Sequence, residues 1–427
     1  MAREYKDSGI EWIGQIPKEW EVARGKYLFS VLNGYAFDSS LFTNDTNMMP
    51  LIRIRDINNS ETEAYYMGDY SSDYIVQKGE VLVGMDGDFN VAKWKGSDAL
   101  LNQRVCKLNV FSEKYISLYA YYILPMLLKT KNDVTYATTV KHLSSNDILN
   151  FDFIVPTITE QQKIADYLDK TCGEVDEMVT LQETMIEELK AYKQSVITEA
   201  VTKGINPNAP MRNSGIDWIG EIPEHWDTGK TLYVLSLPIT DGPHTTPDLF
   251  DDGVPFISAD AVSDGYINFD NKRGFVSKEF YDECCKKYIP QLYDVYMIKS
   301  GASTGRTAIV ETQEIFTIWS PLAVFRANPE VMTPYYLLYM LRSDGYQKQV
   351  ETFWSYGTQQ NIGMRTLEKL IVCIPPLSEQ RAIASYLDTK CSEIDALVAL
   401  KQAKIEELKE YKKSVIFEYV TGKKEVM

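Results

Sequence analysis

The stretch that decides the fold is residues 378–421, SEQRAIASYLDTKCSEIDALVALKQAKIEELKEYKKSVIFEYVT. It contains no proline or glycine, and one set of residues recurs at alternating spacings of four and three: Leu387, Cys391, Ile394, Val398, Lys401, Ile405, Leu408, Lys412, Val415 and Tyr419. This spacing is typical of the heptad seam of a coiled coil. A helix of roughly 43 residues would be about 65 Å long. Because such a helix is too long and too narrowly apolar to be an ordinary buried helix, the pattern predicts that it packs against a partner helix.

The partner is a second copy in the same chain. Residues 155–202 align without gaps on residues 374–421, and more than half of the aligned positions are identical. The seam recurs there as Leu168, Cys172, Val175, Val179, Gln182, Ile186, Leu189, Lys193, Val196 and Ala200. The polar seam residues cost stability but can fix register and orientation.

A second repeat precedes each helix. SGIEWIGQIPKEW at residues 8–20 returns as SGIDWIGEIPEHW at residues 214–226. Between the repeated blocks the two halves share only fragments, such as Asn33-Gly34 against Asp241-Gly242. Here, two copies of one module keep their ends and diverge in their middles, which indicates a shared frame that holds two different recognition units.

The diverged middles are predicted to be mixed α/β domains. Short β-rich runs at residues 51–55, 80–84 and 294–298 alternate with Gly, Asn and Asp clusters, and helical spacing appears at residues 115–128 and 334–342. Thr159 and Ser378 are the predicted N-caps of the long helices, with Glu160 and Glu379 in the first turns, where the helix dipole favours acid.

The predicted fold class is therefore two α/β (α+β) domains, related by a pseudo-two-fold internal repeat and joined by two long helices that form a coiled coil with each other. We expect a first α/β domain with its N-terminal motif at 1–155, the first long helix at 156–204 and a linker at 205–212. A second α/β domain follows at 213–374, then the second long helix at 375–422 and a tail at 423–427.

Composition limits the function classes. The net charge is −16, although a nucleic-acid binder is expected to be basic. The two middles are nearly balanced, with 13 basic against 15 acidic residues at 23–152 and 13 against 17 at 229–373. No run of about 18 apolar residues and no secretory signal occurs, so the expected location is the cytoplasm, without a membrane partner. The six cysteines form no CxxC pair, which indicates buried free thiols.

Catalytic motifs are missing from the sequence. The segment 301–307, GASTGRT, resembles a phosphate-binding loop, but three residues separate its glycines where four are required, and Arg306 replaces the lysine. There are three histidines and no HExxH or GxSxG motif, and no glycine fingerprint or adenine-methyltransferase signature occurs. These absences predict a chain that is not an enzyme and that binds no cofactor or metal of its own.

The repeated residues resemble a known family. Each half carries Pro-x-x-[ST]-Glu-Gln-x-x-Ile-Ala-x-Tyr-Leu-Asp, beginning at Pro156 and Pro375, followed by Glu-Leu-Lys-x-Tyr-Lys-x-Ser-Val-Ile. Together with the Ile-Pro-x-x-Trp motif and the duplication, they make almost the whole chain similar to the specificity subunits of Type I restriction-modification systems. Residues 241–247, DGPHTTP, also resemble a segment common in the target recognition domains of that family, whereas Asn33-Gly-Tyr-Ala-Phe in the first half departs from it.

The resemblance implies that the two long helices pack antiparallel, as an antiparallel coiled coil that joins two target recognition domains. It further implies a sequence-specific DNA-binding subunit whose two domains recognise an asymmetric bipartite site in double-stranded DNA. Its implied partners are two modification subunits, which methylate adenine with S-adenosylmethionine, and optionally restriction subunits, which use ATP and Mg. The alternative is an adaptor in which the coiled coil presents two protein-binding domains and no DNA is bound.

Candidate DNA-contacting residues are those whose side chains can reach base edges or phosphates from loops. They are Arg53, Arg55, Asn90, Lys93, Lys95 and Arg104 in the first domain and His244, Thr245, Thr246, Lys299, Ser303, Arg306, Gln359 and Asn361 in the second. Structural roles compete with this interpretation: Arg53 and Arg55 alternate on a predicted strand and can face solvent, His244 can hold a turn, and residues 359–361 can cap a helix.

Overall fold

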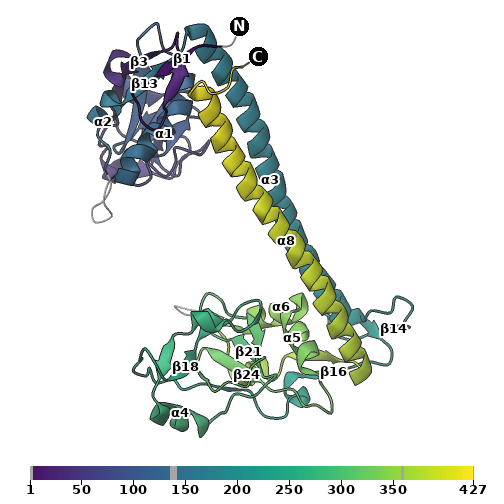
Figure 1. The fold of residues 1–427 in the computed structure, drawn as a ribbon. Helices are drawn as coiled ribbons and strands as arrows, with labels where there is room; N and C mark the ends of the chain where they lie inside the picture. The colour runs from purple at the N-terminus through teal and green to yellow at the C-terminus, as the bar shows by residue number, and fades with distance from the viewer. Residues whose placement is uncertain (1–2, 135–141, 357–359, 427) are drawn as a thin grey trace. The chain divides into compact units, whose positions relative to one another are not determined.

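The computed structural model describes residues 3–134, 142–356 and 360–426, which form two compact units. Unit 1 comprises Met1–Gln182 and Ala403–Met427, and unit 2 comprises Glu183–Gln402. Each unit contains one α/β domain and part of each long helix, because the division falls inside both α3 (Ile158–Lys203) and α8 (Leu377–Val420) (Figure 1). None of the described helices is long and apolar enough to cross a membrane.

The two long helices pack antiparallel in both units. In unit 1 the rings of Tyr167 and Tyr419 lie 4.4 Å apart, and Lys412 Nζ is 2.6 Å from Asp176 Oδ1. In unit 2 Lys193 Nζ is 2.8 Å from Asp395 Oδ1. Most apolar seam residues are buried, among them Leu168, Cys172, Leu387 and Cys391. These contacts confirm the predicted antiparallel coiled coil.

The predicted N-caps of these helices are wrong. Helix α3 begins at Ile158, because the Thr157 hydroxyl accepts a hydrogen bond from the Glu160 N–H (3.3 Å) and donates one to Glu160 Oε2 (2.9 Å), which satisfies an otherwise free donor of the first turn. Helix α8 begins at Leu377, so Ser378 also lies inside the helix.

The domain of unit 1 is built on two sheets. One has the order β10-β9-β12-β4 and is antiparallel; the other has the order β5-β7-β6-β11-β8, in which β6 and β11 are parallel. The strands are β4 (Phe29–Asn33), β5 (Phe42–Thr43), β6 (Met49–Ile52), β7 (Tyr65–Tyr66), β8 (Ile75–Val76), β9 (Val81–Gly84), β10 (Val91–Lys93), β11 (Ala99–Leu101) and β12 (Val105–Val110). The remaining elements are β1 (Tyr5–Asp7) paired with β2 (Gln15–Pro17), β3 (Glu21–Arg24) paired with β13 (Asp152–Val155), and helices α1 (Ser117–Val134) and α2 (Ser145–Asn150).

The domain of unit 2 repeats this plan. Its sheets have the orders β17-β24-β21-β22-β19 and β20-β18-β23, and β18 and β23 are parallel, as β6 and β11 are in unit 1. The strands are β17 (Thr240–Asp241), β18 (Val254–Ile257), β19 (Gly265–Tyr266), β20 (Gly274–Val276), β21 (Val295–Ile298), β22 (Thr307–Ile309), β23 (Thr317–Ile318) and β24 (Leu322–Phe325). The remaining elements are β14 (Met211–Asn213) with β15 (Glu221–Pro223), β16 (Asp227–Lys230) with β27 (Ile371–Ile374), β25 (Ser355–Tyr356) with β26 (Gln360–Asn361), and helices α4 (Lys278–Cys285), α5 (Pro334–Arg342), α6 (Asp344–Phe353) and α7 (Met364–Leu367).

The repeated Glu-Gln motif fixes the start of each long helix to its domain. Gln161 is fully buried; its amide donates to the carbonyls of Lys114 (2.7 Å) and Pro156 (2.8 Å) and accepts from the Ile116 N–H (3.0 Å). Gln380 makes the same three bonds, with Val331, Pro375 and Thr333 at 2.7–2.8 Å. These bonds satisfy backbone groups that would otherwise be buried without partners.

The glutamate of the motif holds the N-terminal hairpin of each half. The indole N–H of Trp20 donates to Glu160 Oε2 at 3.1 Å, and that of Trp226 donates to Glu379 Oε2 at 2.9 Å. Both tryptophans are buried. The blocks that the two halves share in sequence are therefore the blocks that contact one another in the structure, which explains why they repeat together.

The cysteines are free thiols, as predicted. All are buried except Cys285, which is partly exposed. Burial raises the pKa of the Cys106 and Cys373 thiols to about 12, so these two behave as small apolar side chains.

Candidate nucleic-acid interface

In the first domain, several loops meet where the parallel strands β6 and β11 end. The Asn102 N–H donates to the Ile52 carbonyl (3.3 Å), and the Tyr35 N–H donates to the Leu101 carbonyl (2.9 Å). The Met85 N–H donates to the Arg104 carbonyl (2.9 Å), and the Leu143 N–H donates to the Met85 carbonyl (2.8 Å). We call this group of loops the first loop edge; it comprises residues 33–35, 53–56, 85–90, 102–104 and 142–145.

The second domain gathers equivalent loops where β18 and β23 end. The Trp319 N–H donates to the Ile257 carbonyl (2.9 Å), and the Ser320 N–H donates to the Pro243 carbonyl (3.2 Å). The Lys299 N–H donates to the Pro321 carbonyl (2.8 Å), and the Lys299 carbonyl accepts from Ile362 (2.9 Å). The second loop edge comprises residues 241–246, 258–261, 299–306, 319–321 and 360–361, together with Arg273, which stacks on Trp319, and Lys287, which pairs with Asp241.

One glycine in each edge requires this close packing. A Cβ placed on Gly34 would lie 2.0 Å from the Asn102 carbonyl oxygen, and one on Gly242 would lie 2.1 Å from the Ile318 carbonyl oxygen. The similarity between Asn33-Gly34 and Asp241-Gly242 in the sequence therefore marks the same backbone crossing in both domains.

The structure brings four of the six candidate residues of the first domain to the loop edge. Arg53 and Arg55 lie in the turn after β6 and not on a strand, contrary to prediction, because the Asp56 carboxylate accepts from the Arg53 backbone N–H at 2.9 Å and closes the turn. Asn90 and Arg104 are exposed on neighbouring loops. All four residues therefore belong to the loops that meet at the C-terminal ends of the parallel strands β6 and β11.

The other two candidates of the first domain lie elsewhere. Lys93 Nζ pairs with Asp169 of α3 at 2.7 Å, so its charge is already engaged by the helix. Lys95 is exposed beyond the end of the β9–β10 hairpin that is opposite to the loop edge.

Carboxylates neutralise the arginines of the first loop edge. Arg53 and Arg55 both pair with Glu63, at 2.9 and 3.4 Å, and Arg104 pairs with Asp86. Partial burial opposes ionisation of Asp86, but hydrogen bonds from Arg104 and His142 outweigh burial and lower its pKa. A bound phosphate would therefore replace or share these carboxylate partners.

In the second domain, His244, Thr245 and Thr246 are exposed in the loop after β17, and Arg306 is exposed in the β21–β22 hairpin. Ser303 lies in the same hairpin, and Asn361 lies beside it, because the Ser300 and Asn361 backbones form a β-bridge. Lys299 is buried, with its Nζ 3.3 Å from Asp241 Oδ2. Gln359 lies outside the described residues.

Three basic residues of the loop edges were missed by the sequence analysis. His142 Nδ1 lies 2.8 Å from Asp86 Oδ1 in the first edge. In the second, Arg273 stacks over the Trp319 ring at 4.0 Å and Lys287 pairs with Asp241. Arg273 and Lys287 belong to the dipeptides Lys272-Arg273 and Lys286-Lys287. These adjacent basic residues are the sequence pattern that could have indicated them as DNA-binding candidates.

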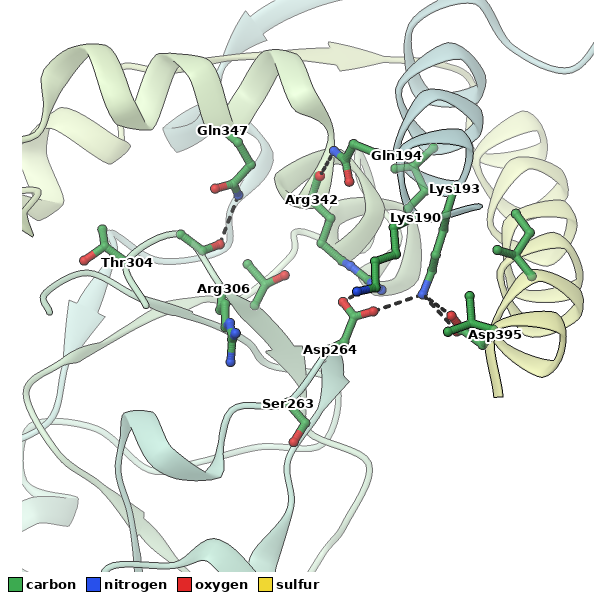
Figure 2. A pocket seen from close by; sticks show the side chains of 15 residues that line it. Lys190, Lys193, Gln194, Ser263, Asp264, Thr304, Arg306, Arg342, Gln347 and Asp395 are labelled. Carbon is green, nitrogen blue, oxygen red and sulfur yellow. Dashed lines mark hydrogen bonds and ion pairs between the residues drawn. The ribbon is translucent and has the colours of Figure 1, made fainter. Parts of the chain in front are cut away.

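A pocket of about 620 Å³ in unit 2, lined mostly by polar side chains, lies beside the β21–β22 hairpin (Figure 2). Gln347 of α6 donates to the Gly305 carbonyl at 3.0 Å. Across the pocket, Lys193 Nζ is 2.9 Å from Asp264 Oδ2 and 2.8 Å from Asp395 Oδ1, while the Arg306 side chain points away from this cluster. The hairpin and the helix pair of unit 2 therefore line the same pocket. No group of three or more His, Cys, Asp or Glu side chains suited to a metal ion occurs in the described part of the chain.

The chain is similar to known proteins over most of its length. The family model for the Type I restriction modification DNA specificity domain matches residues 17–191 and 242–410. The chain is 30% identical over 410 residues to the Type I restriction enzyme EcoBI specificity subunit of Escherichia coli, covering 93% of this chain and 84% of that protein. It is 23% identical over 357 residues to the MjaVIII specificity subunit of Methanocaldococcus jannaschii, covering 83% of this chain and 81% of that one.

Among solved structures, a chain from work on complex assembly and conformational transition of the type I R-M system superposes with a TM-score of 0.70. The two chains are 17% identical, and the match covers 95% of this chain and 98% of that chain. This likeness shows a common fold.

Proposed function

Because this chain belongs to the Type I restriction modification DNA specificity family, we propose that each of its two loop edges recognises one part of a bipartite target in double-stranded DNA. The chain is the DNA specificity subunit of a Type I restriction-modification system and is itself non-catalytic. Family membership sets aside the alternative of an adaptor that binds no DNA.

One observation supports the proposal for the loop edges. Both domains build the same edge on the same pair of parallel strands, yet the side chains there differ: Asn33 in the first edge stands where Asp241 stands in the second, and His142 where Asn361 does. Sequence readout requires that donors and acceptors be held at defined positions by a rigid frame. Different side chains on one frame favour two different half-sites, and therefore an asymmetric target.

The residues proposed to contact DNA are those at the two edges. In the first edge they are Arg53, Arg55, Asn90 and Arg104, with His142 added by the structure; in the second they are His244, Thr245, Thr246, Ser303, Arg306 and Asn361, with Arg273 added by the structure. Each good bidentate contact to a base contributes about 1–3 kcal/mol of discrimination.

The proposed partners supply the chemistry. We propose two modification subunits, which would bind S-adenosylmethionine and methylate adenine, and, as optional partners, restriction subunits, which would use ATP and Mg. The near-neutral charge of both domains supports a need for partners, because neutralised phosphates provide most of the sequence-independent affinity for DNA.

Methylation mapping tests the proposal. Cells with and without the gene are compared by methylome sequencing, and the expected difference is one bipartite adenine-methylation motif. Arg306→Ala should relax one half of that motif, whereas Lys95→Ala, which also removes an exposed cation, should leave both halves intact. A methylome that is identical with and without the gene would contradict the proposal.

A further inference from the structure

A buried carboxylate lies at the base of the second loop edge. Asp241 is fully buried, and its carboxylate contacts three basic side chains: Oδ1 pairs with Lys287, and Oδ2 lies 3.3 Å from Lys299 Nζ and 3.1 Å from His244 Nε2. Lys287 Nζ also donates to the Gly242 carbonyl at 3.3 Å. A carboxylate removed from water is costly unless it is paired, and the ion pairs with the two lysines offset that cost.

The first loop edge lacks this charge. Asn33 occupies the equivalent position before the equivalent glycine, and its Oδ1 accepts a hydrogen bond from Ser145. An asparagine is therefore compatible with the backbone crossing, so the crossing itself does not require the negative charge at Asp241.

The cations around Asp241 differ in their access to solvent. The Lys287 side chain is 47% exposed and that of His244 71%, whereas the Lys299 side chain is only 11% exposed. Lys287, His244 and Thr245 line a cavity of about 530 Å³, at whose base Asp241 lies. One carboxylate thus holds two lysines beside the exposed residues 244–246.

We propose that Asp241 is a positioning residue that acts as an internal counter-ion: it orders the loop 242–246 and withholds Lys287 and Lys299 from DNA phosphates. The inference rests on the proposed role of the second loop edge in reading DNA. Phosphate contacts carry no sequence information, while contacts from the loop to base edges do. A carboxylate that occupies the lysines therefore lowers affinity for all sequences and preserves discrimination between them.

Asp241→Asn in the full chain, assembled with its modification subunit, tests the inference by fluorescence anisotropy on a target duplex and on a scrambled duplex. Release of one lysine should strengthen binding to the scrambled duplex and steepen its salt dependence. Each added phosphate contact makes the loss of affinity between 50 and 200 mM salt about 3.5-fold larger. Discrimination between the duplexes should fall.

Two further variants separate this effect from simple charge and from misfolding. Glu330→Gln makes the same change in net charge at an exposed turn after β24, away from the loop edge, and should not steepen the salt dependence. Asp241→Asn combined with Lys287→Gln should return the salt dependence toward that of the wild type. If Asp241→Asn does not fold, Lys287→Gln alone tests the inference. It removes one of the cations paired with Asp241, so it should reduce discrimination between the two duplexes without strengthening binding to the scrambled duplex.

The inference is wrong if Asp241→Asn weakens binding to both duplexes equally at an unchanged salt dependence, or if it changes neither. Full discrimination by Lys287→Gln would also overturn it. Failure of the proposed function is a separate result, because the wild-type complex itself would then bind the target and scrambled duplexes equally.

Discussion

Gly34 and Gly242 allow two loops to cross more closely than any side chain permits. Each lies at or just after the end of a strand and packs against the backbone that follows the second parallel strand of its domain. Because the nearest atoms are carbonyl oxygens and not flexible side chains, an added methyl group can be accommodated only by moving the backbone of the loop edge.

Gly34→Ala and Gly242→Ala are expected to destabilise the chain by about 1–3 kcal/mol each, the usual cost of overpacking. The measurement is urea unfolding, together with methylation mapping of the half-site that belongs to the altered domain. Gly173→Ala is the matched control: Gly173 lies in α3, where an added methyl group would meet only open space, so alanine should stabilise the helix by about 0.5–1 kcal/mol. Equal effects of all three substitutions would contradict the prediction.

The sequence indicated several residues that lie at the loop edges, but it did not indicate their secondary structure or their ion-pair partners. Arg53 and Arg55 were placed on a strand because apolar and basic residues alternate there, but the Asp56 carboxylate three residues later closes a turn. Lys93 was a reasonable DNA-binding candidate, yet Asp169, distant in sequence, binds it. Such partners belong to tertiary structure, so no local pattern could have revealed them.

At the scale of elements, each long helix is attached to its domain by the residues at its start. Gln161 and Gln380 each satisfy three backbone groups of the preceding segments with one buried amide. The repeated motif predicted a helix start, but not this role. Its side chain joins segments almost 50 residues apart, which helical periodicity cannot show.

Gln380→Leu is expected to destabilise unit 2 by about 2–4 kcal/mol, since the Thr333 N–H and the carbonyls of Val331 and Pro375 lose their buried partner. Unfolding in urea measures the change. Gln162→Leu provides the control, because Gln162 is exposed and its amide bonds to Asp166, one turn away on the same helix; its cost should stay below about 0.5 kcal/mol. A comparable loss in both variants would argue against the role of the buried amide.

The seam lysines of the two helices, Lys193 and Lys412, differ in the carboxylates they bind and in their burial. Lys193 bonds Asp395 of α8 and Asp264 of the second domain (Figure 2), whereas its repeat equivalent Lys412 bonds Asp176. The Lys193 side chain is 12% exposed and that of Lys412 is 30% exposed. We expect Lys193→Met to cost roughly 1–2 kcal/mol and Lys412→Met less than about 1 kcal/mol.

The difference in unfolding free energy between the wild type and Lys193→Met should change with pH in a defined direction. Burial opposes the charge on Lys193, but its bonds to Asp395 and Asp264 prevail and raise its pKa above 10.5. A group with a raised folded-state pKa contributes stability at lower pH and loses it as pH rises through that pKa. The gap in unfolding free energy between the wild type and Lys193→Met should therefore narrow above about pH 10.5, and a gap that widens there would contradict the assignment.

At the scale of the whole molecule, the fold class followed from the repeat. The coiled coil and the two domains were predicted because a heptad seam and two duplicated blocks are visible in one sequence. The common sheet plan of the two domains was not predicted, since strands of two to six residues with divergent side chains leave almost no sequence signal.

Exchange of residues 227–374 for the equivalent domain of another specificity subunit should change one half of the methylation motif and leave the other unchanged. The physical reason is that all contacts of each loop edge named above lie within its own domain. Methylome sequencing of the chimera measures both halves at once. A chimera that alters both halves, or neither, would show that the two domains do not recognise DNA independently.

The N-terminal hairpin has a consequence for the order in which the chain folds during synthesis. In unit 1 the hairpin and α1 both contact the end of α8 and the residues after it: Lys423 donates to the Ile13 carbonyl of the hairpin at 2.9 Å, and Tyr119 of α1 donates to the Val420 carbonyl at 2.8 Å. Unit 2 is one continuous stretch, whereas unit 1 requires Ala403–Met427, which leaves the ribosome after all of unit 2. The domain translated first is therefore completed last, and until then the apolar surface that receives Val415 and Val420 is available to chaperones.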